Sequence, residues 1–126
     1  MTLDFIDPIN AYGDNVVRLY SFDKAEALLF RDAVLQTVLR DKQELHLSTL
    51  EFIDLRNCRL VLRLSEEDQG IISSNKIDFY CELSLAGYER MLLLIEPFCH
   101  RETKAHQWLY DVDSLTDLLF SPAGTW

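Results

Sequence analysis

The chain has 126 residues, the usual size of one domain, and we expect a single domain over residues 1–126. Acidic residues outnumber basic ones 21 to 12, which gives a formal net charge of −9 at pH 7. Because a negative field repels nucleic-acid phosphates and anionic lipids, we expect neither nucleic acid nor a membrane as a partner, and a basic protein is favoured instead.

Cysteine usage and apolar patterning predict a cytoplasmic protein. The three cysteines, at positions 58, 81 and 99, cannot all pair within one chain and none lies in a C-x-x-C spacing, so we expect reduced thiols. The N-terminus has no basic segment followed by an apolar run, so no signal peptide is expected. The longest apolar run, residues 91–95, is far shorter than the ~20 residues that a membrane span needs.

The first predicted elements are an arm, a strand and a helix. Residues 1–14 are rich in turn formers and predict an N-terminal arm, and β-branched and aromatic residues over 16–22 predict a strand. Asp23 is a natural N-cap, and Glu26 three residues later predicts a capping box. Apolar residues then recur at helical spacing, which predicts a long helix over residues 23–42.

The next segments predict three strands. Residues 45–55 alternate, but the parity of the apolar positions changes near Ser48, which predicts a β-bulge there. Residues 58–64 and 77–85 alternate with period two, which is typical of half-buried antiparallel strands. An antiparallel register that sets opposite charges across the exposed face gives three cross-strand pairs: Arg63 with Asp78, Val61 with Tyr80, and Arg59 with Glu82.

The remaining chain predicts a second helix and a hairpin. The polar connection 65–76 is long for a hairpin and predicts either a projecting loop or a small extension through residues 71–72. Residues 86–96 predict a helix that ends at Pro97, with a strand over 91–95 as the alternative. Two strands over residues 107–112 and 115–121, joined by a turn at 113–114, complete the chain.

This order of elements favours the α+β class. We expect an antiparallel sheet of about five to six strands, with one long N-terminal helix and one shorter helix packed on it.

Two residues are candidates for binding a small ligand. Arg31 falls within the apolar stripe of the first helix, where its guanidinium could hold an anion or a carboxylate. The alternative is an arginine whose stem packs on the sheet while its head extends to water. His46, on the following strand, is the second candidate, in a cavity between the sheet and its helices.

Two further groups are candidates for binding a protein. Glu66, Glu67 and Asp68 form an acidic cluster in the long connection, and Trp108 and Trp126 belong to an aromatic C-terminal segment. Aromatic residues anchor protein interfaces, although these can equally close the core.

No metal or cofactor is expected. Cys99, His100 and His106 do not have the spacing of a compact zinc module, and residues 111–117 lack the glycine and the fifth ligand of a calcium loop. The chain contains neither a phosphate-binding glycine loop nor a G-x-S-x-G motif. The sequence therefore favours a non-enzymatic protein-binding or accessory domain, with a small-ligand binder or enzyme as the alternative and a homodimer as a third reading.

Overall fold

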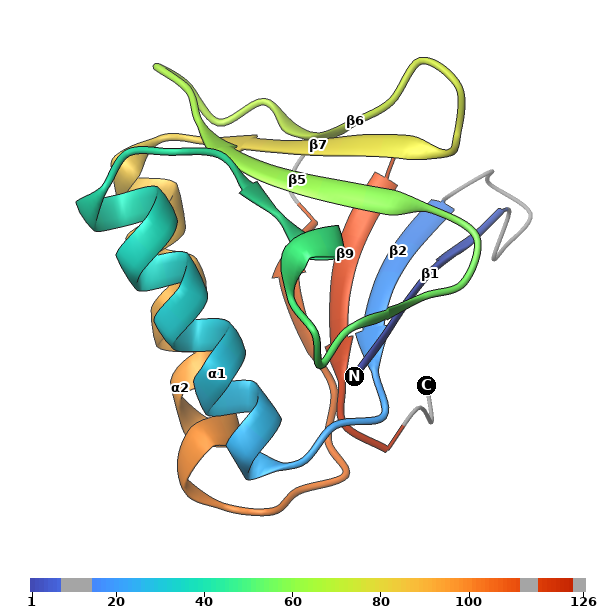
Figure 1. The fold of residues 1–126 in the computed structure, drawn as a ribbon, viewed down its shortest axis with the longest axis vertical. Coiled ribbons are helices and arrows are strands. Elements are labelled where there is room, and N and C mark those ends of the chain that lie inside the picture. The colour runs from blue at the N-terminus through green and yellow to red at the C-terminus, as the bar shows by residue number, and fades with distance from the viewer. Residues whose placement is uncertain (8–14, 112–115, 124–126) are drawn as a thin grey trace.

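The computed structural model describes residues 1–7, 15–111 and 116–123 (Figure 1). Within these ranges the chain forms two α-helices and two mixed sheets, of five and four strands. Sheet A contains, in spatial order, β4 (Asp54–Leu55), β1 (Thr2–Ile6), β2 (Asn15–Tyr20), β9 (Thr116–Ser121) and β8 (Gln107–Tyr110). Sheet B contains β3 (Leu45–His46), β5 (Arg59–Leu64), β7 (Asp78–Leu83) and β6 (Gly70–Ile72). The helices are α1 (Lys24–Ala33), which continues as the π-helical segment Val34–Arg40, and α2 (Leu85–His100).

The two helices lie side by side along one side of the molecule, and the strands of sheet B run across one end of sheet A (Figure 1). The α+β class is therefore as predicted. None of the helices within the described residues is both long and apolar enough to span a membrane.

The first helix begins where its cap residue predicts. The Asp23 carboxylate accepts a hydrogen bond from the Glu26 amide at 2.9 Å, as an N-cap does. The second half of the predicted capping box is wrong, because the Glu26 carboxylate accepts instead from the amine of Met1 at 2.7 Å.

The second helix continues past the residue that was predicted to end it. Ser84 caps α2 by accepting from the Gly87 amide at 3.1 Å, and the helix runs through Pro97 to His100. Proline removes one helical donor, and the carbonyl left without it belongs to Leu93, on the exposed side of the helix. The alternative strand over residues 91–95 is thus excluded, and α2, with 16 residues, is longer than the 10 residues of α1 proper.

The central pair of sheet B departs from the predicted antiparallel register. β5 and β7 pair in parallel, and the cross-strand pairs on their outer face are Arg59 with Asp78, Val61 with Tyr80, and Arg63 with Glu82. The connection between them forms β6, which pairs antiparallel with β7 on the side away from β5. Because the chain reverses once to form β6 and again to form β7, β7 runs in the direction of β5. The prediction of an antiparallel sheet is therefore wrong here, whereas the predicted extension through residues 71–72 is confirmed.

Parallel pairing recurs in sheet A. β2 pairs in parallel with β9, and β1 pairs in parallel with β4. The strand predicted over residues 16–22 is confirmed as β2, although it ends at Tyr20, and the final hairpin is confirmed as the antiparallel pair of β8 and β9. The turn predicted at 113–114 lies outside the described residues.

Two other predictions were wrong. Residues 2–6 of the predicted arm form strand β1, which pairs antiparallel with β2, and residues 8–14 lie outside the described ranges. The predicted bulged strand over residues 45–55 is instead β3, a 3-10 turn at Leu47–Thr49, and β4 in the other sheet. The change of parity near Ser48 thus marks a passage between two sheets, each of which buries its own face.

An aromatic cluster fills the core between the helices and sheet A. The ring centroid of Phe120, on β9, lies 4.1 Å from that of Phe22, 5.1 Å from that of Phe98 and 5.9 Å from that of Phe30. Phe30 and Phe98 belong to α1 and α2, so this cluster fixes both helices against the same strand.

A buried tyrosine fixes α2 against sheet B. The Tyr88 hydroxyl, on a fully buried side chain, donates toward the carbonyl of Cys81 at 2.6 Å and that of Arg63 at 2.9 Å. Those carbonyls belong to β7 and β5, so one side chain connects α2 to both strands. Burial raises the pKa of Tyr88, which keeps the hydroxyl a donor at neutral pH.

Candidate functional site

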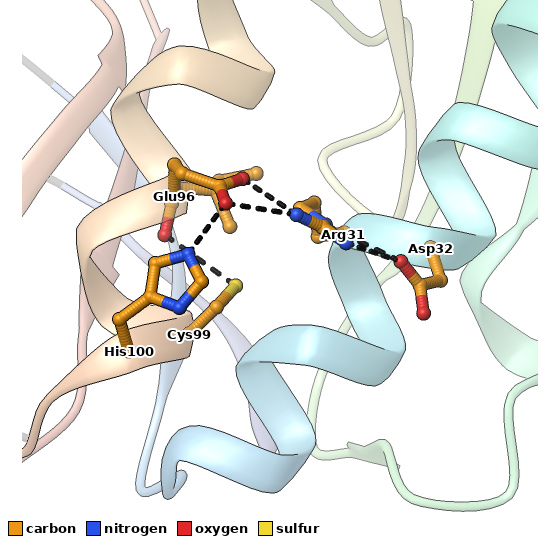
Figure 2. Close-up of polar contacts among 6 residues, drawn as sticks. Arg31, Asp32, Glu96, Cys99 and His100 are labelled. Carbon is orange, nitrogen blue, oxygen red and sulfur yellow. Dashed lines mark hydrogen bonds and ion pairs between the residues drawn. The ribbon is translucent and has the colours of Figure 1, made fainter.

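Arg31 is part of an ion-pair network between the two helices (Figure 2). Its Nη1 donates to both carboxylate oxygens of Glu96 on α2, at 2.7 and 2.9 Å, and its Nη2 donates to Asp32 at 3.0 Å. The guanidinium therefore binds carboxylates, as one of the two interpretations of its position predicted. These carboxylates belong to Glu96 and Asp32 of the same chain and not to a ligand. Arg31 ties α1 to α2, and its role as a ligand-binding residue stays a prediction.

Glu96 is shared between Arg31 and a histidine of its own helix. The His100 Nε2 atom lies 2.6 Å from Glu96 Oε1, one turn along α2 (Figure 2). The hydrogen bonds from Arg31 and then from His100 hold the pKa of Glu96 below its ordinary value. Cys99 lies beside this network, and burial raises the pKa of its thiol, which makes it a poor nucleophile.

His46 lies apart from Arg31. It is exposed on β3, and its Nε2 is 3.3 Å from the carboxylate of Glu44. It borders a shallow hollow of about 190 Å³ on the outer face of sheet B, beside Arg59 and Asp78. No cavity found in the described part of the chain is lined by both Arg31 and His46. These three cavities do not join the two residues, and the role of His46 in ligand binding stays a prediction.

A groove of about 600 Å³ lies between α2 and β8. This volume falls within the ~300–1,000 Å³ range of ligand sites. One wall comes from α2, the second from β8, and the third from the connection that leads into β6. The residues lining this α2–β8 groove are Asp68, Gln69, Gly87, Arg90, Leu94, Gln107, Trp108, Leu109, Tyr110 and Asp111.

The groove follows β8 along its length. Residues 107–111 line it consecutively. The register of β8 against β9 shifts between Trp108 and Tyr110, and such an irregularity interrupts the regular alternation of side chains. β8 is the last strand of sheet A within the described residues, with β9 as its neighbour there. The groove therefore lies beside the outermost described strand of sheet A.

The wall that the connection contributes is fixed by Asp68. Its Oδ1 accepts hydrogen bonds from the Ser84 amide and hydroxyl, both at 2.8 Å, which holds the connection against the start of α2. A Cβ at Gly87 would lie 2.6 Å from the same oxygen, so glycine allows this close approach. The two hydrogen bonds from Ser84, followed by the positive charge of Arg90, lower the pKa of Asp68. Asp68 therefore stays a negative charge on the groove wall.

Arg90 is a cation of the groove that the sequence did not single out. It is exposed on α2, and within the part of the chain that the structure describes it forms no hydrogen bond or ion pair. This contrasts with Arg31, whose donors are engaged by two carboxylates. Gly87, Arg90 and Leu94 lie on α2 at a spacing of three and four residues, which is the signal that they share a face.

The predicted protein-binding residues have different positions. Asp68 and Trp108, from the acidic cluster and the aromatic segment, line the same groove. Glu66 and Glu67 are exposed in the connection immediately before Asp68. Trp126 lies outside the described residues. The structure thus brings one member of each predicted group together, places Tyr110 of the aromatic segment beside them, and adds Arg90 and Asp111, which sequence reasoning did not propose as binding residues.

Comparison with protein-family models, with curated proteins and with solved structures finds no match to this chain. Among the described residues, no group of three or more His, Cys, Asp and Glu side chains is arranged to hold a metal ion. Function is therefore inferred from the α2–β8 groove itself.

Proposed function

We propose that the chain is a non-enzymatic protein-binding domain and that the α2–β8 groove is its contact surface. The observation that carries the proposal is the lining of the groove by residues 107–111, which places Trp108 and Tyr110 together beside α2. Aromatic side chains supply much of the binding energy in protein interfaces. Half-buried rings in a groove are well suited to contact another chain.

The partner proposed for this surface is basic. Asp68 and Asp111 line the groove, and Glu66 and Glu67 are exposed beside it. The net charge of −9 adds a long-range attraction for a positive surface and speeds association at low ionic strength. The cytoplasm is the proposed location, and the three free thiols, of which Cys58 and Cys81 are buried, support a reducing compartment.

The test is capture from the lysate of the source cell with the wild-type chain and with Trp108→Ala. We expect a basic protein to be bound at low salt and released at high salt. Loss of an anchoring indole should reduce its capture at least about tenfold. Tyr80→Ala is the matched control, because Tyr80 is an aromatic residue on the outer face of sheet B, away from the groove. Equal capture by both variants, or a partner whose binding is insensitive to salt, would contradict the proposal.

A second candidate function is the binding of a small ligand in the same groove. Its volume of about 600 Å³ and Arg90, which forms no ion pair among the described residues, favour this reading, because a guanidinium can bind a carboxylate or phosphate bidentately. Native mass spectrometry of chain purified from its source distinguishes the two candidates. A small anion that copurifies with the wild type and is lost from Arg90→Gln would favour ligand binding. A measured mass equal to that of the chain alone, together with a captured protein, would favour protein binding.

A further inference from the structure

We propose that the outer face of sheet B is a self-complementary surface on which a second copy of this chain binds. The outer face is the side turned away from both helices and from sheet A (Figure 1). This inference goes beyond the α2–β8 groove and concerns a different side of the molecule, so a dimer formed here leaves the groove open. A change at Tyr80 therefore affects the dimer and not the groove.

The outer face carries three rows of side chains, each of which crosses β5 and β7. The first and third rows are the ion pairs Arg59–Asp78 and Arg63–Glu82. The central row crosses all four strands of the sheet and is mostly apolar: His46, Val61, Tyr80 and Ile72. Ile72 is 41% exposed, although isoleucine is a residue type that is usually buried. An apolar row between two charged rows is the layout of an interface with a polar rim.

The direction of the strands makes this face complementary to itself. β5 and β7 are parallel, so a two-fold axis that runs along the strands, above the gap between them, places each strand over the other strand of the second copy at the same level. Arg59 then lies over Asp78 of the second copy, and Arg63 lies over Glu82 of the second copy. Each of these arginines thus gains a carboxylate from the second copy, and the two central rows face each other between the charged rows.

The charges select this arrangement over the alternative one. A two-fold axis that runs across the strands would place β5 over β5 in the reverse direction, with Arg59 over Arg63 and the two acids over each other. Both charged rows would then repel.

The selected arrangement agrees with the way in which sheets pack. Two sheets that pack face to face lie about 10 Å apart and cross at about 30°. This angle displaces the charged rows by about 3 Å, because they lie two residues from the central row, and an arginine side chain spans such a shift. Glu44, a further acid 3.4 Å from Arg63, lies over Gly70 of the second copy, which carries no charge.

The size of the face and the charge of the chain predict a weak dimer. Four strands of at most six residues cover an area of about 20 Å by 20 Å, which is smaller than the interface of a stable complex. The net charge of −9 repels a second copy at long range, and about 0.15 M salt screens this repulsion beyond about 8 Å. We therefore expect a Kd of about 100 µM at that salt concentration.

The test is sedimentation equilibrium of the full chain from about 10 µM to about 1 mM in about 0.15 M salt. Arg59→Asp and Asp78→Arg each bring like charges together at two symmetric contacts, and each should raise the Kd at least about tenfold. Asp78→Arg makes the chain less negative by two charges, so a general charge effect would strengthen association instead. Glu89→Arg, the same change of charge at an exposed residue of α2, is the matched control and should leave the dimer at least as stable as in the wild type.

A mixture of the two single variants tests the two-fold arrangement. The chain with Arg59→Asp presents acids where the chain with Asp78→Arg presents arginines, so an equimolar mixture should associate about as tightly as the wild type. The double variant that carries both changes keeps an ion pair within the chain and stays complementary to itself, so it should dimerise alone. It also covers the case in which a single variant does not fold, which circular dichroism detects.

Three results would overturn the proposal: no association of the wild type at about 1 mM, a dimer that neither single change weakens, or a folded double variant that stays monomeric. A dimer that is lost in both single variants and restored in their mixture supports it.

Discussion

The pair β5–β7 lies at the centre of sheet B, whereas β8 is the outermost described strand of sheet A. In sheet B both central strands have a neighbour on each side, and their exposed charges are paired as Arg59 with Asp78 and Arg63 with Glu82. In sheet A, β8 has β9 beside it and follows a groove in which Arg90 forms no ion pair among the described residues. The most regular sequence pattern therefore forms the central pair of sheet B, and the groove lies beside a strand whose pairing is irregular.

The largest expected difference between these regions is in the cost of removing a buried leucine. Leu62, on β5, is fully buried, and Leu62→Ala should lower the free energy of unfolding by about 3–5 kcal/mol because it leaves a closed cavity. Leu109, on β8, is also buried but lines the groove. Water and neighbouring side chains can fill the space there, so Leu109→Ala should cost about 2 kcal/mol.

Urea unfolding of the two leucine variants, followed by circular dichroism, measures both values. Equal costs, or a larger cost at Leu109, would break the contrast between a closed interior and an open groove.

A smaller effect is expected at the hydroxyl that joins α2 to sheet B. Tyr88→Phe removes the donor from the carbonyls of Cys81 and Arg63 without changing the packing of the ring. A lost hydrogen bond that leaves a buried acceptor unsatisfied costs about 1–3 kcal/mol. Tyr80→Phe is the control on β7, because its ring keeps the contact with the Arg63 guanidinium. Urea unfolding measures this cost as well. A Tyr88→Phe variant as stable as the control would show that the hydrogen bonds of the Tyr88 hydroxyl contribute nothing to stability.

The smallest effect concerns the network between the helices and depends on pH. Pairing lowers the pKa of Glu96 in the folded chain, so the pair stabilises the fold above the ordinary carboxyl pKa of 4.5 and this contribution is lost as the pH falls through the folded value. Glu96→Gln should therefore be less stable than wild type at neutral pH, by at most about 1 kcal/mol for an exposed pair.

The stability difference between the wild type and Glu96→Gln should shrink as the pH falls below 4.5, because protonation of Glu96 breaks the pair. Melting temperatures of both proteins between neutral pH and pH 3 test this, and a difference that grows on acidification would have the wrong sign. Lys24→Gln, an exposed charge change at the start of α1, is the control for unspecific charge effects.

Much of the fold follows from periodicity, but the direction of β7 does not. Val61 faces Tyr80 in both the predicted and the observed pairing, because arginines lie two residues on each side of Val61 and acids lie two residues on each side of Tyr80. Reversing one strand therefore exchanges the partners of the arginines without losing either opposite-charge pair. The direction was decided by β6, and its only sequence signal was two isoleucines in a long polar connection.

The candidate site was less predictable than the fold. Asp68 and Trp108 were singled out for their residue types, but their meeting in one groove depends on how α2 packs between the ends of two sheets. Arg90 was overlooked because an arginine on the exposed side of a helix is an ordinary surface residue. Arg31 attracted attention by its position in an apolar stripe, and that position turned out to serve a contact between α1 and α2.

The parallel pairing of β2 with β9 has a consequence for the order in which the chain can fold. Sheet B draws all of its strands from residues 45–83, so its pairings are available once that middle segment has emerged. Sheet A joins strands from the two ends of the described chain, and β9 lies between β2 and β8. Pairings between such distant segments carry a high loop-closure cost and slow the search for the native state. The sheet that borders the proposed binding groove is therefore the one completed last.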